Sequence, residues 1–223
     1  MNRTSSILVG ALLLSALVAR EAAAQWNVAD FGRDRNRVYL TFGLDPAFVV
    51  TLGYGHVVSL GGHDVQLTGD VGVVTARLDA RDFRVRLGTQ TSLVRWGSLR
   101  LTGSATAIAR GTDNSIYRAF DFGSDFTGTL GVYRHGWFAA GEVGFDKAIV
   151  THITNSEWYR THFYPGAKDG WYMASAGTFH AGLTSGLKLG RTELLGRVGM
   201  LRTERFNTLA PPMYASLGMG IGF

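Results

Sequence analysis

The chain has 223 residues, of which 17% are charged and 30 are glycine. An average soluble domain has about 25% charged residues and about 7% glycine, so this composition argues against a coiled coil, a disordered chain or an ordinary helical enzyme. The sequence contains no cysteine, which excludes disulfide bonds and thiolate metal sites. The net charge of +5 is modest and no block of Lys and Arg occurs, so we expect no nucleic-acid partner.

Residues 1–24 have the features of a cleaved signal peptide. Arg3 supplies a positive charge near the start, and Ile7–Val18 is an uninterrupted run of mostly apolar residues. This run is shorter than the roughly 20 residues that a membrane-spanning helix needs. Three alanines ending at Ala24 predict cleavage between Ala24 and Gln25. We therefore expect an exported protein; a cytosolic protein with a buried N-terminal helix is the alternative.

The remainder divides into a periplasmic N-terminal segment, residues 25–36, and one domain, residues 37–223, in which apolar side chains alternate with polar or small ones. The clearest run is Met213–Phe223, where every second residue from Met213 onward is apolar or alanine. Strict alternation over about ten residues predicts a β-strand. Six further clear runs lie near residues 65–73, 83–93, 99–110, 120–132, 137–149 and 178–188. Three noisier runs lie near residues 37–44, 47–60 and 191–202.

Alternation alone does not tell whether the apolar face meets a protein core, as in a soluble sandwich, or lipid, as in a membrane barrel. The runs are long enough for tilted membrane-spanning strands, and their polar faces are rich in Gly, Ser, Thr and Ala. Aromatic residues near the strand ends are typical of interfacial girdles. These are Phe42, Phe48, Phe83, Phe120 and Phe122 at one rim, and Trp96, Tyr133, Trp137 and Phe223 at the other. We expect an all-β fold, a closed antiparallel up-and-down transmembrane β-barrel of ten strands, with eight strands as the alternative.

The connections between the runs differ in length at the two ends of this expected barrel. Short glycine turns lie near residues 61–62, 96–97, 134–136 and 190–191, whereas longer connections cover about 111–118, 151–171 and 203–212. Asp45-Pro46 and Leu78–Asp82 are short connections on the long-loop side. Short turns inside and long loops outside are typical of bacterial outer-membrane barrels.

The end of the chain carries a recognisable pattern. Leu217, Met219, Ile221 and the terminal Phe223 alternate with small residues. With the leader and the ten runs, this pattern resembles the small outer-membrane β-barrel proteins of the OmpX/OmpW type. The resemblance implies that the barrel-assembly machinery reads these four residues as an insertion signal. It also implies a location in the outer membrane of a Gram-negative cell envelope, in contact with lipid and lipopolysaccharide.

Many charged residues fall on the polar faces of the runs, and therefore inside the expected barrel. They are Asp70, Arg84, Arg86, Arg110, Asp121, Asp125, Glu142, Asp146, His180 and Arg197. Because a lone buried ion is costly, we expect opposite charges to pair into a network that fills and rigidifies the lumen. The alternative is a narrow porin-like channel for small polar solutes, with a selectivity set by these charges.

The long connection at residues 151–171 holds two further sets of candidates. Its aromatic residues Trp158 and Tyr159, with Trp171 and Tyr172 at its end, either pack on the rim at the lipopolysaccharide interface or form a contact surface for a partner. Its polar residues could in principle form a hydrolase site: His152, Ser156, Glu157, His162 and Asp169.

No spacing marks a catalytic site, either in this loop or around Asp121, Asp125 and His180, where Ser175 and Ser185 fall on the opposite face. We therefore expect no enzyme. Nor do we expect a cofactor or a metal, because the gap between His152 and His162 fixes no geometry. The role expected is structural or based on surface interaction, and a soluble periplasmic barrel with an apolar ligand inside is a further alternative.

Overall fold

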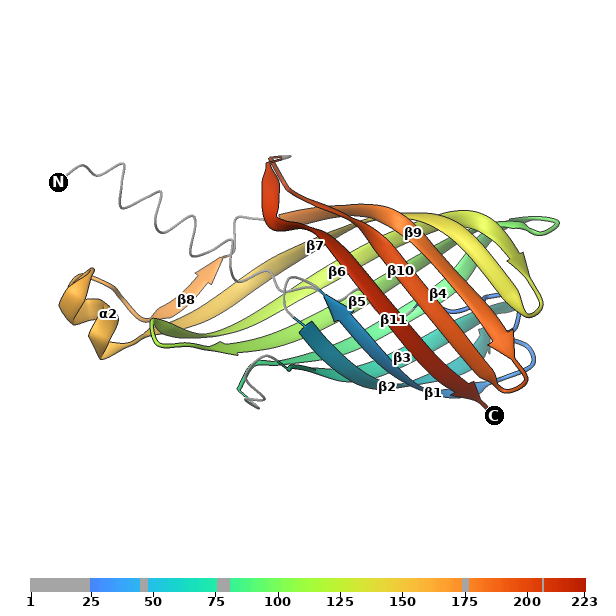
Figure 1. The fold of residues 1–223 in the computed structure, drawn as a ribbon, viewed down its shortest axis with the longest axis horizontal. Helices are drawn as coiled ribbons and strands as arrows, with labels where there is room; N and C mark the ends of the chain where they lie inside the picture. The colour runs from blue at the N-terminus through green and yellow to red at the C-terminus, as the bar shows by residue number, and fades with distance from the viewer. Residues whose placement is uncertain (1–24, 45–47, 76–80, 174–176, 206) are drawn as a thin grey trace.

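A computed structural model describes residues 25–44, 48–75, 81–173, 177–205 and 207–223. The expected signal peptide, the Asp45-Pro46 connection, residues 78–80 and Ser175 lie outside the described residues. Within them the protein is almost entirely antiparallel β-structure (Figure 1). No helix among the described residues is long and apolar enough to cross a membrane.

The elements follow one another along the chain as hairpins. They are β1 (Asn36–Leu44), β2 (Phe48–Leu60), β3 (His63–Val74), β4 (Phe83–Trp96), β5 (Leu99–Asp113), β6 (Tyr117–Arg134), β7 (Trp137–Asn155), α2 (Glu157–His162), β8 (Gly170–Met173), β9 (Gly177–Leu189), β10 (Thr192–Thr203) and β11 (Thr208–Gly222).

Ten of the strands close into a barrel. Each pairs antiparallel with its sequence neighbour, except that β7 pairs with β9 across the insertion of α2 and β8. The circle is completed by β1 and β11, which pair from Arg37 opposite Gly222 to Leu44 opposite Ala215. Strand β8 pairs only with the end of β7 and stands outside this circle. The prediction of a closed ten-stranded up-and-down barrel is confirmed.

The two faces of the wall differ in chemistry. Outward-facing side chains are apolar and well exposed, as at Leu183 (64%) and Leu217 (72%). Most inward-facing positions hold polar or charged side chains that are buried, as at Thr184 on β9 and Arg197 on β10. The outside of the barrel is therefore apolar, and the interior is mainly polar, with one cluster of buried apolar side chains that includes Tyr39, Phe138 and Leu195.

One end of the barrel is made of four two-residue turns, at residues 61–62, 97–98, 135–136 and 190–191; we call it the turn end. Gly61, Gly62, Gly97, Gly136 and Gly190 all have positive φ there. Two-residue hairpin turns that match the strand twist require positive φ, which glycine adopts without strain. The short connections expected from the sequence lie at this end.

The opposite end, the loop end, is uneven in height. Strand β1 has 9 residues and β7 has 19, so β5, β6 and β7 rise well beyond the rest of the wall and carry α2 and β8 at their tip (Figure 1). We call the part formed by residues 150–173 the extension.

Three expected loops are corrected by this arrangement. Strand pairing continues through most of residues 111–118, leaving only 114–116 as a turn. In the region 203–212, β10 ends at Thr203 and β11 already begins at Thr208, and the region 151–171 is partly strand and helix. The sequence placed a loop at Pro211-Pro212, but β11 includes both prolines. Among the described residues, β1 pairs with β11 only from Ala215 onward, and proline is tolerated where a strand has no partner on one side.

The expected aromatic girdles are found outside the barrel with one exception. Phe42, Phe48, Trp96 and Phe223 face outward and are exposed. Tyr133, which the sequence analysis placed in a girdle, is buried inside. It stacks on Phe138 with ring centroids 5.1 Å apart, and its hydroxyl lies 2.6 Å from Thr129 Oγ1. Its position one residue after the outward-facing Val132 fixes this inward orientation.

Candidate functional site

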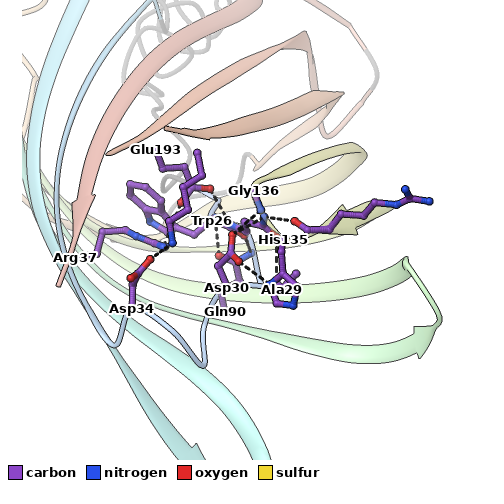
Figure 2. Close-up of polar contacts among 12 residues, drawn as sticks. Trp26, Ala29, Asp30, Asp34, Arg37, Gln90, His135, Gly136 and Glu193 are labelled. Atoms are coloured by element: carbon purple, nitrogen blue, oxygen red, sulfur yellow. Dashed lines mark hydrogen bonds and ion pairs between the residues drawn. The ribbon is translucent and has the colours of Figure 1, made fainter. Parts of the chain in front are cut away.

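A segment of chain before the first strand fills the barrel at its turn end. Residues 25–35, which we call the N-terminal plug, contact side chains from opposite walls (Figure 2). Residues 25–31 lie inside the ring of strands, and residues 32–35 lead out to β1 and are more exposed. Trp26, Asn27 and Asp30 of the plug are almost wholly buried. The sequence analysis set residues 25–36 apart from the barrel; in the structure the plug belongs to the interior and Asn36 begins β1.

Trp26 is the anchor of the plug. Its backbone N–H donates to Gln90 Oε1 at 3.0 Å, and Gln90 Nε2 donates back to the Trp26 carbonyl at 3.2 Å. Its ring meets Tyr39 edge to face at 5.1 Å, and the Arg37 guanidinium lies 4.4 Å from the ring centroid. Gly220 on β11 makes room for the indole, because a Cβ there would collide with it. The plug is thus fixed by stacking as well as by hydrogen bonds.

Charged groups complete the attachment of the plug. Glu193 accepts the Asn27 backbone N–H at 3.3 Å and pairs with Arg37 at 3.2 Å. Asp30 accepts from Asn27 Nδ2 at 3.0 Å and lies 2.9 Å from His135 Nδ1 at the β6–β7 turn (Figure 2). Asp34 pairs with Lys188 of β9. The plug is therefore tied to several strands around the circumference.

Two clusters of charged groups lie beyond the plug, further from the turn end. In the first, Asp70 accepts from Arg86 Nε at 2.7 Å and from the Tyr39 hydroxyl at 2.8 Å. In the second, Arg197 donates to both carboxylate oxygens of Glu142, at 3.0 and 2.6 Å, and the Tyr214 hydroxyl also donates to Glu142. Each cluster joins side chains from neighbouring or nearby strands, so it braces the wall from within.

Two more clusters lie nearer the loop end. Arg110 pairs with Asp121 at 3.5 Å and with Asp146, while Arg84 lies buried on the neighbouring strand opposite Arg110 in register.

The second of these clusters surrounds His180. Its Nε2 lies 3.2 Å from Asp125 Oδ2 and 3.1 Å from Thr127 Oγ1, and Thr127 donates to Asp125 Oδ1 at 2.7 Å. Gly144 leaves space for the imidazole, since a Cβ there would collide with it. All ten charged residues that the sequence placed in the lumen are buried and face inward.

Comparison with protein-family models finds no match, and no curated protein matches the chain either. What the site can do therefore rests on its own geometry. Among the described residues, no group of three or more His, Asp or Glu side chains is placed to hold a metal ion.

Sequence reasoning missed several interior residues. Arg37, Glu193 and Tyr39 take part in the interior contacts and are buried. Their alternation with outward-facing residues such as Val38 and Leu194 was a usable signal, but all three lie in runs with weak alternation. The plug had no such signal, because its residues follow neither a period of two nor a helical period.

The extension carries the aromatic residues singled out in the sequence. Trp158 and Tyr159 lie in α2, and Trp171 and Tyr172 in β8; all but Tyr159 are well exposed. Trp158 stacks with His162 at 5.3 Å, and Trp171 meets His152 edge to face at 5.0 Å. The tip therefore presents aromatic rings on both of its secondary-structure elements.

An ion pair holds the tip together. Asp169 pairs with Arg160 of α2 at 2.5 Å and accepts the Asn155 backbone N–H at 2.8 Å. The hydrogen bonds from Arg160 and from the Asn155 backbone lower the Asp169 pKa to about 2.

Two of the polar residues considered for a hydrolase make structural contacts here. The Ser156 hydroxyl accepts from the Tyr159 backbone N–H as the N-cap of α2 and donates to the Ser115 carbonyl. The Nδ1 of His162 contacts the Trp158 carbonyl at 3.0 Å.

Proposed function

We propose that this protein is an integral protein of a bacterial outer membrane, exported with removal of residues 1–24, with its lumen closed and its extension held outside the membrane. One observation carries the proposal. Large apolar side chains that are more than half exposed surround the barrel. They are Leu52, Leu87, Phe126, Val143, Leu183, Val198 and Leu217.

We call these residues the apolar belt; an exposed apolar surface of this kind is unfavourable in contact with water. Soluble monomers rarely expose continuous apolar patches larger than a few hundred Å². Hydrocarbon, in contrast, favours an apolar exterior and requires every backbone N–H and C=O to be paired, which a closed barrel provides. A soluble barrel that binds an apolar ligand needs an open apolar interior, whereas in this protein the buried apolar cluster packs around Trp26 and Phe31 of the plug and other parts of the interior hold ion pairs.

The interior supports a closed lumen. The plug fills the turn end, and the four charged clusters beyond it join opposite charges from different strands. Side chains nearly fill the interior of a barrel of about eight strands, and ten strands widen it only slightly. A packed, paired interior stiffens the barrel and leaves little room for a solute path.

The extension supports a role in contact outside the cell. Exposed tryptophan and tyrosine side chains are enriched at binding hot spots. Trp158 of α2 and Trp171 of β8 are 48% and 59% exposed and lie at the tip of the paired strands β6 and β7. A surface partner would meet these rings first.

Three measurements test the proposal. The chain expressed with its leader should remain in the membrane fraction after a carbonate wash and should migrate faster on a denaturing gel before boiling than after it. Release by carbonate without detergent would contradict membrane integration. The purified barrel should give no large, steady conductance in a planar bilayer; such a conductance would instead support the narrow porin-like channel.

A further inference from the structure

The first residue of the plug occupies an unusual chemical position. Gln25 is only 4% exposed, and its side-chain carbonyl oxygen is buried without a hydrogen-bond partner among the described residues. The next residue, Trp26, is clamped through both its backbone N–H and its carbonyl by Gln90. The start of the plug is therefore held inside the barrel. If cleavage follows Ala24, the new amino terminus is held there too.

A charged amino terminus does not fit this environment. A free α-amino group has an ordinary pKa of about 8 and is a cation at neutral pH, and a buried unpaired ammonium carries a large desolvation cost. The plug already holds a buried cation, Arg37, against the ring of the adjacent Trp26.

The carboxylates of the plug region already have partners. Glu193 pairs with Arg37 and accepts the Asn27 N–H. Asp30 bonds to Asn27 and contacts His135, and Asp34 pairs with Lys188. A second cation at Gln25 would have to compete for groups that hold the plug in place.

We propose that Gln25, which becomes the amino terminus on the export proposed above, cyclises to pyroglutamate and enters the barrel as a neutral lactam. The free amine attacks the side-chain amide carbon, forming a new C–N bond. The bond to the amide nitrogen breaks, and ammonia leaves with a proton from the attacking amine. The step needs no oxidant or co-reactant. It removes the terminal charge and retains the buried oxygen as the carbonyl oxygen of the lactam.

The mass of the intact protein isolated from the membrane of a Gram-negative host tests this inference. The expected mass is that of residues 25–223 less one ammonia. The mass of residues 25–223 with no loss would overturn the inference and leave the proposed export intact. The mass of the full chain would overturn both, because no terminus would then form at Gln25.

Gln25→Ala is the matched variant, since alanine cannot form the lactam. It should be cleaved at the same bond and keep its amine, and a loss of ammonia in this variant would show that the wild-type loss arises elsewhere and overturn the inference. The variant should also unfold with an equilibrium constant about tenfold or more higher, because its ammonium is buried; an unchanged constant would contradict burial of the terminus.

An enzymatic readout tests the position of the lactam. A pyroglutamyl aminopeptidase should remove it from the unfolded chain but not from the folded barrel. Equal removal from both forms would show that the terminus lies outside the lumen and would overturn the buried lactam.

Discussion

Breaking the Glu142–Arg197 pair should destabilise the barrel severely, whereas neutralising both partners should not. Both side chains are almost fully buried, and two hydrogen bonds join them. Removing one partner of a buried pair leaves an uncompensated charge, which costs about 3–5 kcal/mol. We therefore expect Glu142→Gln and Arg197→Met each to lower the free energy of unfolding by about 4 kcal/mol.

The double variant Glu142→Gln/Arg197→Met removes both charges and keeps an acceptor for the Tyr214 hydroxyl. Replacing a buried pair by neutral groups is often nearly neutral, so we expect the double variant within about 1 kcal/mol of wild type. Arg118→Met is the surface control, because this arginine is 66% exposed in its pair with Asp113 and should matter by about 1 kcal/mol or less.

The assay is equilibrium unfolding by urea in lipid vesicles, with the folded fraction read from the mobility of unboiled samples on a gel. A loss of less than about 1 kcal/mol of unfolding free energy in either single variant would contradict the buried ion pair. A loss in the double variant equal to the sum of the two single losses would contradict it as well.

Three further perturbations address other parts of the molecule. The Asp169 pKa of about 2 lies below its ordinary value of about 3.9, so its ion pair stabilises the extension above pH 4 and is lost as the pH falls toward 2. Pepsin should therefore cut the wild-type extension more slowly than that of Asp169→Asn at pH 4 but at nearly the same rate at pH 2, a ratio at each pH that cancels the pH dependence of pepsin itself; equal rates for the two proteins at pH 4 would contradict the ion pair. Gly220→Ala should displace the indole of the plug and cost about 1–3 kcal/mol in unfolding free energy, whereas the outward-facing Gly141→Ala should cost little. Val143→Arg places a charge in the apolar belt and should make the free energy of folding into vesicles less favourable by about 2–4 kcal/mol. Leu189→Arg, beside a turn, should cost about 0–1 kcal/mol. Equal costs for the two variants would contradict the presence of hydrocarbon around the barrel.

Much of the fold was readable because a barrel wall has two faces of opposite chemistry. Every clear run of alternating residues corresponds to a strand, and the side on which Leu183 or Leu217 falls is the exposed one. The lumen residues follow from the same period, because a residue between two outward-facing neighbours must face inward. The position of Asp70 or Glu142 in the alternation therefore predicted that its side chain faces inward, without the help of any motif.

What the sequence did not reveal depends on contacts distant in the chain. The plug is fixed by Gln90 and Glu193, which lie 64 and 166 residues from their partners in the plug. No local sequence pattern therefore predicts the plug. The continuation of β7 to Asn155 depends on pairing with β6 and β8 beyond the apolar belt. In that part of the strand no apolar outer face is required, so the sequence need not alternate. Which lumen charges pair with one another depends on strand register, which alternation alone does not specify.

The central claim is that the apolar belt touches hydrocarbon, and the absence of cysteine from the chain makes a direct test simple. Single cysteines at Leu130, Leu183 and Val198, carrying spin labels in lipid vesicles, report whether dissolved oxygen or a water-soluble relaxing agent reaches each site. The account predicts strong relaxation by oxygen and protection from the water-soluble agent at all three positions. Ready access of the water-soluble agent to these positions in the folded barrel would contradict it.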